Sequence, residues 1–299
     1  MFSLRRDQFR AILFGILIAD ALSHQHLSGS LVPLFYRQTS GDELPILTPV
    51  AIASNHWCQQ ITTVLQDLTC NRLQPHSIEL LTSNTAGQTA SMSGVDTLLL
   101  TFPWLIQGLA CLDAIASDEL MEAILPAAIA PASRTAMRAF YRAAAALLKG
   151  DESAMDAIWQ AETDATNFAT TSLGQAVARS CEQVCLADGD FAITMAQSLK
   201  ASPLIPGLPI LSGFLSACWV GGQGIPTRWL QALLIPSPML QQWLKHRWYI
   251  DNAVSLYKWG ACLNDLWLGR QILSSQMTSR QNHPAVQFAI EPTSWPDFR

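Results

Sequence analysis

The chain has 299 residues and a formal net charge of −5, and charged residues make up only 14% of it. This length allows one large domain or two ordinary ones, with a sizeable core in either case. No basic block is present, which excludes the usual electrostatic footprint of a nucleic-acid-binding protein. The low charge content indicates either much buried surface or some apolar surface that meets a partner.

No run of about 18 apolar residues that could cross a membrane occurs in the chain. The best candidate, residues 98–112, is too short and contains Pro103 and Gln107. The charged N-terminal residues are not followed by a clear signal-peptide cleavage site. The seven cysteines are scattered, which favours reduced core thiols. We therefore expect a soluble, cytoplasmic protein with no transmembrane segment.

The first predicted helix covers residues 9–26, where apolar residues recur at helical spacing and form one wide apolar face. Gly15 and Ala19, four residues apart, leave room for another helix to approach closely. Asp20 falls near the expected C-terminal end, where the helix dipole disfavours an acid. Its carboxylate could pair with a cation or a metal, or it could reach solvent in a loop beginning at Ser23.

Downstream, helical patterns alternate with short breaks and few strand signals appear, so we predict an all-α fold. No linker divides the pattern. We expect a single domain over residues 1–273 and an irregular C-terminal tail over 274–299. Loops are predicted over 28–49 and 82–93, with a glycine turn at 221–226. Helices are predicted over residues 50–70, 75–81, 98–116, 117–130, 133–149, 151–165, 170–187, 191–200, 210–220 and 227–234, with two more within 239–273.

Three stretches carry a family resemblance. Residues 11–23 read Ala-Ile-Leu-Phe-Gly-Ile-Leu-Ile-Ala-Asp-Ala-Leu-Ser, residues 143–151 form an alanine-rich segment ending in Lys-Gly-Asp, and residues 210–230 combine an apolar segment, a glycine turn, Ile-Pro and Trp. In order and spacing they resemble the ADP-ribosylglycohydrolase family, which includes the enzyme that reactivates ADP-ribosylated dinitrogenase reductase. That family opens with G-x-x-x-G-x-x-x-G-D-A-L-G. The resemblance implies a compact, multi-helix orthogonal bundle.

The resemblance also implies what a catalytic member would need. Members of the family hold two magnesium ions between helices, with ligands from a Thr-Asp-Asp-Thr segment and a later Gly-Gly-Asp-Thr-Asp-Thr segment. Magnesium prefers such oxygen ligands. Here residues 56–59, His-Trp-Cys-Gln, stand at the first segment, and Leu204 and Pro206 replace the two aspartates of the second. The family's Thr-His element is replaced by Ala132 and Ser133. Of the acidic set only Asp20 is retained.

One carboxylate cannot hold a dimagnesium centre, so we predict that this centre is absent and that no cofactor is bound. The leading interpretation is a pseudoenzyme of the ADP-ribosylglycohydrolase fold that acts as a protein-binding or scaffold module. The alternative is a divergent ADP-ribosyl hydrolase, or an ADP-ribose- or nucleotide-binding protein, with a rearranged pocket around Asp20.

Candidates for a vestigial pocket are Asp20, His24, His56 and Cys58. If the two helix ends meet, His24, His26, His56 and Cys58 could instead form a zinc site, because imidazole and thiolate ligands favour zinc over magnesium. The simpler interpretation is polar loop residues beside a buried thiol. No catalytic residue is assigned.

Five of the ten tryptophans lie between Trp219 and Trp259. Most belong to a core by default, but some could form an apolar, tryptophan-rich surface for a protein partner or a second copy. Residues 288–299 at the C-terminus resemble a docking peptide, or they pack against their own domain.

Overall fold

The computed structural model describes most of six stretches of the chain, residues 3–27, 56–69, 131–150, 171–205, 207–236 and 238–267. Between the second and third, it describes Val95, Asp96, Leu98, Leu99, Thr101, Phe102 and Leu105. These residues are mainly helical, and no strand occurs among them, which confirms the all-α prediction for this part of the chain. The helices are α1 (Ser3–Leu27), α2 (His56–Thr69), α6 (Pro131–Lys149), α8 (Ser172–Leu186), α9 (Phe191–Ala201), α10 (Leu208–Gly224), α11 (Thr227–Leu234), α12 (Pro238–Trp248) and α13 (Val254–Trp267).

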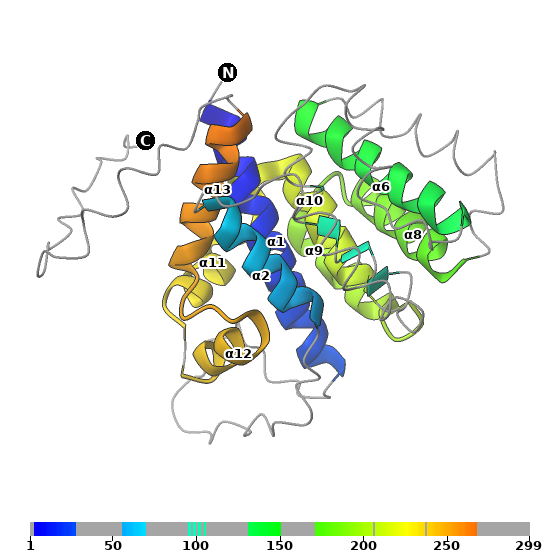
Figure 1. Ribbon diagram of the computed structural model, residues 1–299. Helices are drawn as coiled ribbons and strands as arrows, with labels where there is room; N and C mark the ends of the chain where they lie inside the picture. The colour runs from blue at the N-terminus through cyan, green and yellow to red at the C-terminus, as the bar shows by residue number, and fades with distance from the viewer. Residues whose placement is uncertain are drawn as a thin grey trace, which may run out of the picture.

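Helices α1 and α10 lie side by side at the centre of the described structure (Figure 1). Helices α2 and α13 lie on the α1 side, while α6, α8 and α9 lie against α10 (Figure 1). Every residue from Ala11 to Ala21 is buried. The prediction of one wide apolar face was therefore too narrow: the middle of α1 is covered all round, as expected for a core helix.

The crossing of α1 and α10 depends on small residues in both helices. A Cβ atom added to Gly15 would lie 2.8 Å from the Ala217 Cβ and 2.8 Å from the Gly213 carbonyl oxygen. A Cβ added to Gly213 would lie 2.8 Å from the Ala19 Cβ. The prediction that Gly15 and Ala19 admit a close neighbour is confirmed, and that neighbour is α10.

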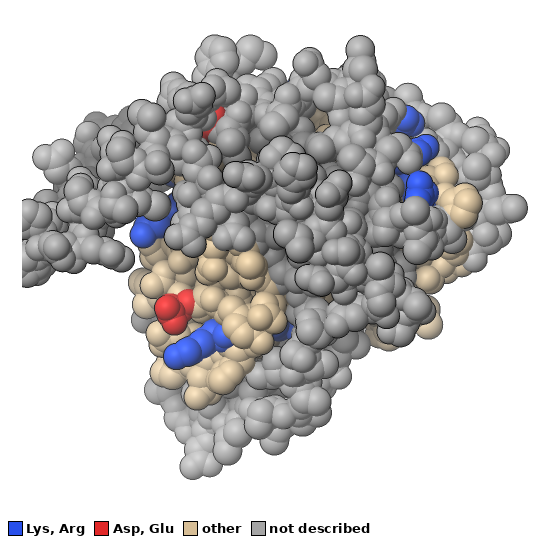
Figure 2. Space-filling view, viewed as in Figure 1, with Lys and Arg blue, Asp and Glu red and all other residues tan. Residues whose placement is uncertain are grey.

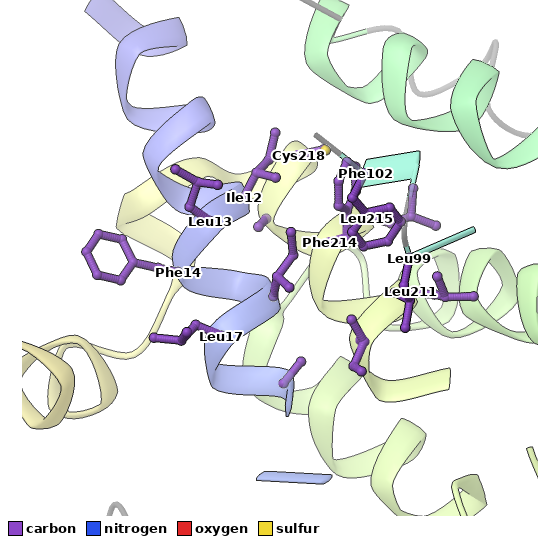
Figure 3. Close-up of a cluster of buried hydrophobic side chains, with 14 of the residues drawn as sticks. Ile12, Leu13, Phe14, Leu17, Leu99, Phe102, Leu211, Phe214, Leu215 and Cys218 are labelled. Atoms are coloured by element: carbon purple, nitrogen blue, oxygen red, sulfur yellow. The ribbon is translucent and has the colours of Figure 1, made fainter. Parts of the chain in front are cut away.

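Larger apolar side chains fill the space around this crossing (Figure 3). Phe102, Phe140 of α6 and Phe214 of α10 pack with ring centroids 4.8–5.8 Å apart. Aromatic rings at this separation add packing energy beyond the area that they bury. This cluster joins α6 to the central pair.

Local signals explain the breaks between α8, α9 and α10. Thr171 caps α8 by accepting a hydrogen bond from the Gly174 N–H, and Asp190 caps α9 through the Ile193 N–H, both at 2.9 Å. Gly189 and Gly207, with φ of 71° and 80°, occupy the left-handed region that favours glycine at helix ends.

Among the described residues, no single helix is both long and apolar enough to cross a membrane. Only α10 and α11 would meet that requirement together, and they are bent by 91° at their junction.

The helices predicted between residues 133 and 234, apart from 151–165, are confirmed with shifted ends, and so are the two helices within 239–273. The glycine turn at 221–226 is wrong in part, because α10 continues to Gly224 with a break at Gly221. The helix predicted over residues 9–26 is confirmed as α1, which runs from Ser3 to Leu27, so Ser23 lies in the helix and not in a loop. The described residues of 98–105 are helical. The other predictions, for 28–49, 75–81, 82–93, 117–130, 151–165 and the tail, lie outside the described residues.

Candidate functional site around Asp20

Asp20 lies in the interior, with only 2% of its surface exposed, and its carboxylate accepts three hydrogen bonds. Arg247 donates through Nε to Oδ2 at 2.6 Å and through Nη2 to Oδ1 at 2.7 Å. The indole Nε1 of Trp248 donates to Oδ2 at 3.0 Å. Of the outcomes that the sequence allowed for this acid, the structure has the pairing with a cation.

Three helices build the site. Asp20 comes from α1, whereas Arg247 and Trp248 occupy the last turn of α12, where a cation also interacts favourably with the helix dipole. Helix α2 contacts α12 at this site: the Thr62 hydroxyl donates to the Trp248 carbonyl oxygen at 2.6 Å. The Trp57 ring packs edge-on against Trp248 at 5.4 Å, and the guanidinium carbon of Arg247 lies 5.9 Å from its centroid.

The charges of the site govern the ionisation of its members. Burial by itself lowers the pKa of Arg247, but the charge of Asp20 and its hydrogen bonds outweigh that effect, so the pKa is raised and the guanidinium stays charged. Burial, followed by the negative charge of Asp20, raises the pKa of Cys58 well above its ordinary value. Cys58 is therefore a neutral thiol near pH 7, and a neutral thiol is a weak nucleophile.

The structure thus brings together two of the four predicted pocket residues, Asp20 and Cys58. His24 lies on α1, like the zinc candidate His26, and His56 begins α2, but all three side chains lie outside the described residues. Within the described part of the chain, no group of three His, Cys, Asp or Glu residues could hold a metal ion. The zinc site stays a hypothesis.

The second expected ligand segment lies at the turn between α9 and α10. Leu204 in this turn is 87% exposed, and Ser202 bonds to the Leu199 carbonyl oxygen through its hydroxyl. No carboxylate lies among the described residues of this turn.

Sequence reasoning missed Arg247, although the pattern of α12 holds a signal for it. Leu240, Trp243, Leu244 and Trp248 are buried at the spacing of an apolar helical face, and Arg247 falls on the same face. An arginine on a buried face is rarely left without a partner. Its presence there predicts an acidic side chain nearby. Asp20 is a candidate for this acid, because it also lies on an apolar helix without a partner that the local sequence supplies.

The tryptophans between 219 and 259 belong mainly to the core. Trp229, Trp243, Trp248 and Trp259 are buried, and Trp219 is partly buried against the core. The interpretation that most of these tryptophans belong to the core is confirmed for these five, and a partner surface elsewhere on the chain stays a prediction. Among the described residues, the exposed large apolar side chains are Leu186, Ile193, Leu204, Ile235, Tyr249 and Val254.

Surface charge among the described residues is uneven. Helix α6 contains arginines at positions 134, 138 and 142, one helical turn apart, and no acid. Lys and Arg atoms appear at the right of Figure 2, where Figure 1 places α6. The Asp20–Arg247 pair is separate from this surface charge because both of its side chains are buried.

The five described cysteines are all free, in agreement with the expectation of reduced thiols.

Burial raises the pKa of Cys181 to about 12, from an ordinary 9.0. Its stabilising contribution is complete below pH 9 and is lost as pH rises toward 12, because the unfolded thiol then releases its proton first. When the pH rises from 7.5 to 10, the free energy of unfolding measured in urea should fall by about 1.4 kcal/mol less in a Cys181→Ala variant than in the wild type. An identical fall in both proteins would contradict the raised pKa of Cys181.

No family model matches this chain, and neither does any curated protein or solved structure.

Proposed function

We propose that this protein is a non-catalytic binding or scaffold module, a pseudoenzyme built on a helical framework like that of the ADP-ribosylglycohydrolases. The observation that supports this proposal is the environment of Asp20. The one retained acid of the family pattern has both carboxylate oxygens bonded to Arg247 and a further bond from Trp248. Its role is to hold α12 against α1.

This arrangement opposes a metal centre at Asp20. A divalent cation would have to replace the guanidinium group or share the carboxylate with it, and like charges a few ångströms apart repel in a buried site. Magnesium would also need further oxygen ligands. The neighbouring side chains at the first segment, Trp57 and Cys58, are an indole and a neutral thiol.

The rival is a divergent hydrolase with Asp20 as its acid or base. A general base has to come within hydrogen-bond reach of the proton that it removes. With 2% of its surface exposed and three donors on its oxygens, Asp20 would first have to lose Arg247. The geometry therefore favours the non-catalytic role.

A binding role needs accessible surface, and the exposed apolar side chains supply part of it. Leu186, Leu204 and Ile235 each expose more than 70% of their surface. Exposed apolar side chains that occur singly are normal on a protein surface, so these three do not by themselves define a binding face. The low charge content of the sequence, 14%, is what favours a protein partner or a second copy of the chain.

A hydrolase assay tests the proposal. Purified full-length protein with ADP-ribosyl-arginine or ADP-ribosyl-serine and magnesium should give no turnover above a protein-free blank, while an active glycohydrolase in the same assay gives product. Turnover by the wild-type protein would overturn the proposal, and its loss in an Asp20→Ala variant shown to be folded at the assay temperature would favour the divergent hydrolase. Calorimetric titration with ADP-ribose separates the remaining alternative, a binding pocket without cleavage, by its heat of binding.

A further inference from the structure

The guanidinium group of Arg247 contacts a carboxylate and an aromatic ring, two groups that favour binding of a guanidinium. Asp20 accepts from Nε and Nη2 at 2.6 and 2.7 Å, and the Trp57 ring lies 5.9 Å from the guanidinium carbon. Trp248 in turn fixes the carboxylate through its indole N–H at 3.0 Å. Asp20 and Arg247 side chains are 2% and 9% exposed, so these contacts are made away from bulk water.

Each of these contacts suits a planar guanidinium group better than other cations. Two adjacent N–H donors match the two oxygens of a carboxylate, whereas an ammonium group is a compact point charge. An aromatic ring also attracts a weakly hydrated guanidinium. A divalent metal ion would find only one carboxylate among Asp20, Trp57 and Trp248.

We propose that Asp20, Trp57 and Trp248 form a guanidinium-binding site, and that Arg247 is its built-in ligand. The site is held in shape from α2 as well as from α1, because the Thr62 hydroxyl anchors the Trp248 backbone at 2.6 Å. The ligand chemistry is that of an arginine side chain. The inference rests on these contacts and does not depend on whether the chain has lost a hydrolase reaction.

Chemical rescue tests the site in the full-length protein. Arg247→Ala removes the ligand and leaves the carboxylate unpaired, so Tm should fall by roughly 6–12 °C. Methylguanidinium at about ten times its Kd should then restore roughly 3 °C, by binding only the folded protein. Methylammonium and magnesium, each as the chloride at matched ionic strength, should restore nothing. The matched control is the double variant Asp20→Asn with Arg247→Ala, in which methylguanidinium should also restore nothing.

Equal rescue by methylammonium or magnesium, or equal rescue in the double variant, would overturn the proposal. Arg247→Lys gives an independent test that needs no added ligand. If the site is specific for guanidinium, the Tm of Arg247→Lys should fall almost as far as that of Arg247→Ala. If the site needs only a positive charge, the Tm of Arg247→Lys would stay near that of the wild type. If Arg247→Ala does not fold alone, recovery of folded protein on refolding with methylguanidinium but not with methylammonium supports the site, and equal recovery with both contradicts it.

Discussion

Replacing Asp20 by alanine should lower the free energy of unfolding by about 3–5 kcal/mol, as measured by urea unfolding followed by tryptophan fluorescence. The variant leaves the Arg247 guanidinium charged in a buried place, without the carboxylate that accepts hydrogen bonds from its Nε and Nη2. Removing the opposite charge of a buried ion pair is among the most destabilising single changes known in proteins. The loss would be a large share of the stability of an ordinary domain.

Two controls separate this loss from a general effect of removing an acid. Asp251→Ala removes an exposed acid in the turn after α12 and should change the free energy of unfolding by less than about 0.5 kcal/mol. The paired change Asp20→Leu with Arg247→Met replaces both charges by apolar groups and should cost much less than Asp20→Ala. If Asp20→Ala behaves like Asp251→Ala, the buried pair does not hold the fold.

The second large effect is expected where α1 crosses α10. Gly15→Ala adds a Cβ that would lie 2.8 Å from both the Ala217 Cβ and a backbone carbonyl oxygen of α10. The two helices have to separate, and we expect a net loss of about 1–3 kcal/mol, against the gain of about 1 kcal/mol that alanine normally gives over glycine within a helix. Urea unfolding measures the net change.

Gly222→Ala is the matched control for this prediction. Gly222 also lies in a helix, but the nearest atom to an added Cβ is 3.8 Å away, which is an ordinary contact distance. This variant should be neutral or up to about 1 kcal/mol more stable than the wild type. If Gly15→Ala proved equally harmless, the close crossing of α1 and α10 would be contradicted.

Much of the helical framework could be predicted because its signals are local. Gly150 ends α6, the Asp-Gly-Asp sequence separates α8 from α9, and Gly15 with Ala19 marks a close helix contact. Each of these features depends on residues within one or two turns of the chain. Such short-range patterns are the ones that a single sequence states most clearly.

The partner of Asp20 could not be predicted in the same way, because Arg247 lies 227 residues away in the chain. The unusual position of Asp20 showed only that it needed a reason. Its surroundings depend on how α12 packs against α1 and α2, which no local pattern specifies. The all-round burial of α1 was missed for the same reason, since covering its second face requires several distant helices.

A double-mutant cycle on Asp20 and Arg247 tests most directly the claim that Asp20 serves the fold through this pair. The free energy of unfolding would be measured for the wild type, Asp20→Ala, Arg247→Ala and the double variant under identical conditions. We predict that the losses of unfolding free energy in the two single variants add up to at least about 2 kcal/mol more than the loss in the double variant. Each single change removes the same ion pair and leaves one buried charge without its counter-charge. Losses that add to within about 0.5 kcal/mol would show that the two residues act independently, and would contradict the account.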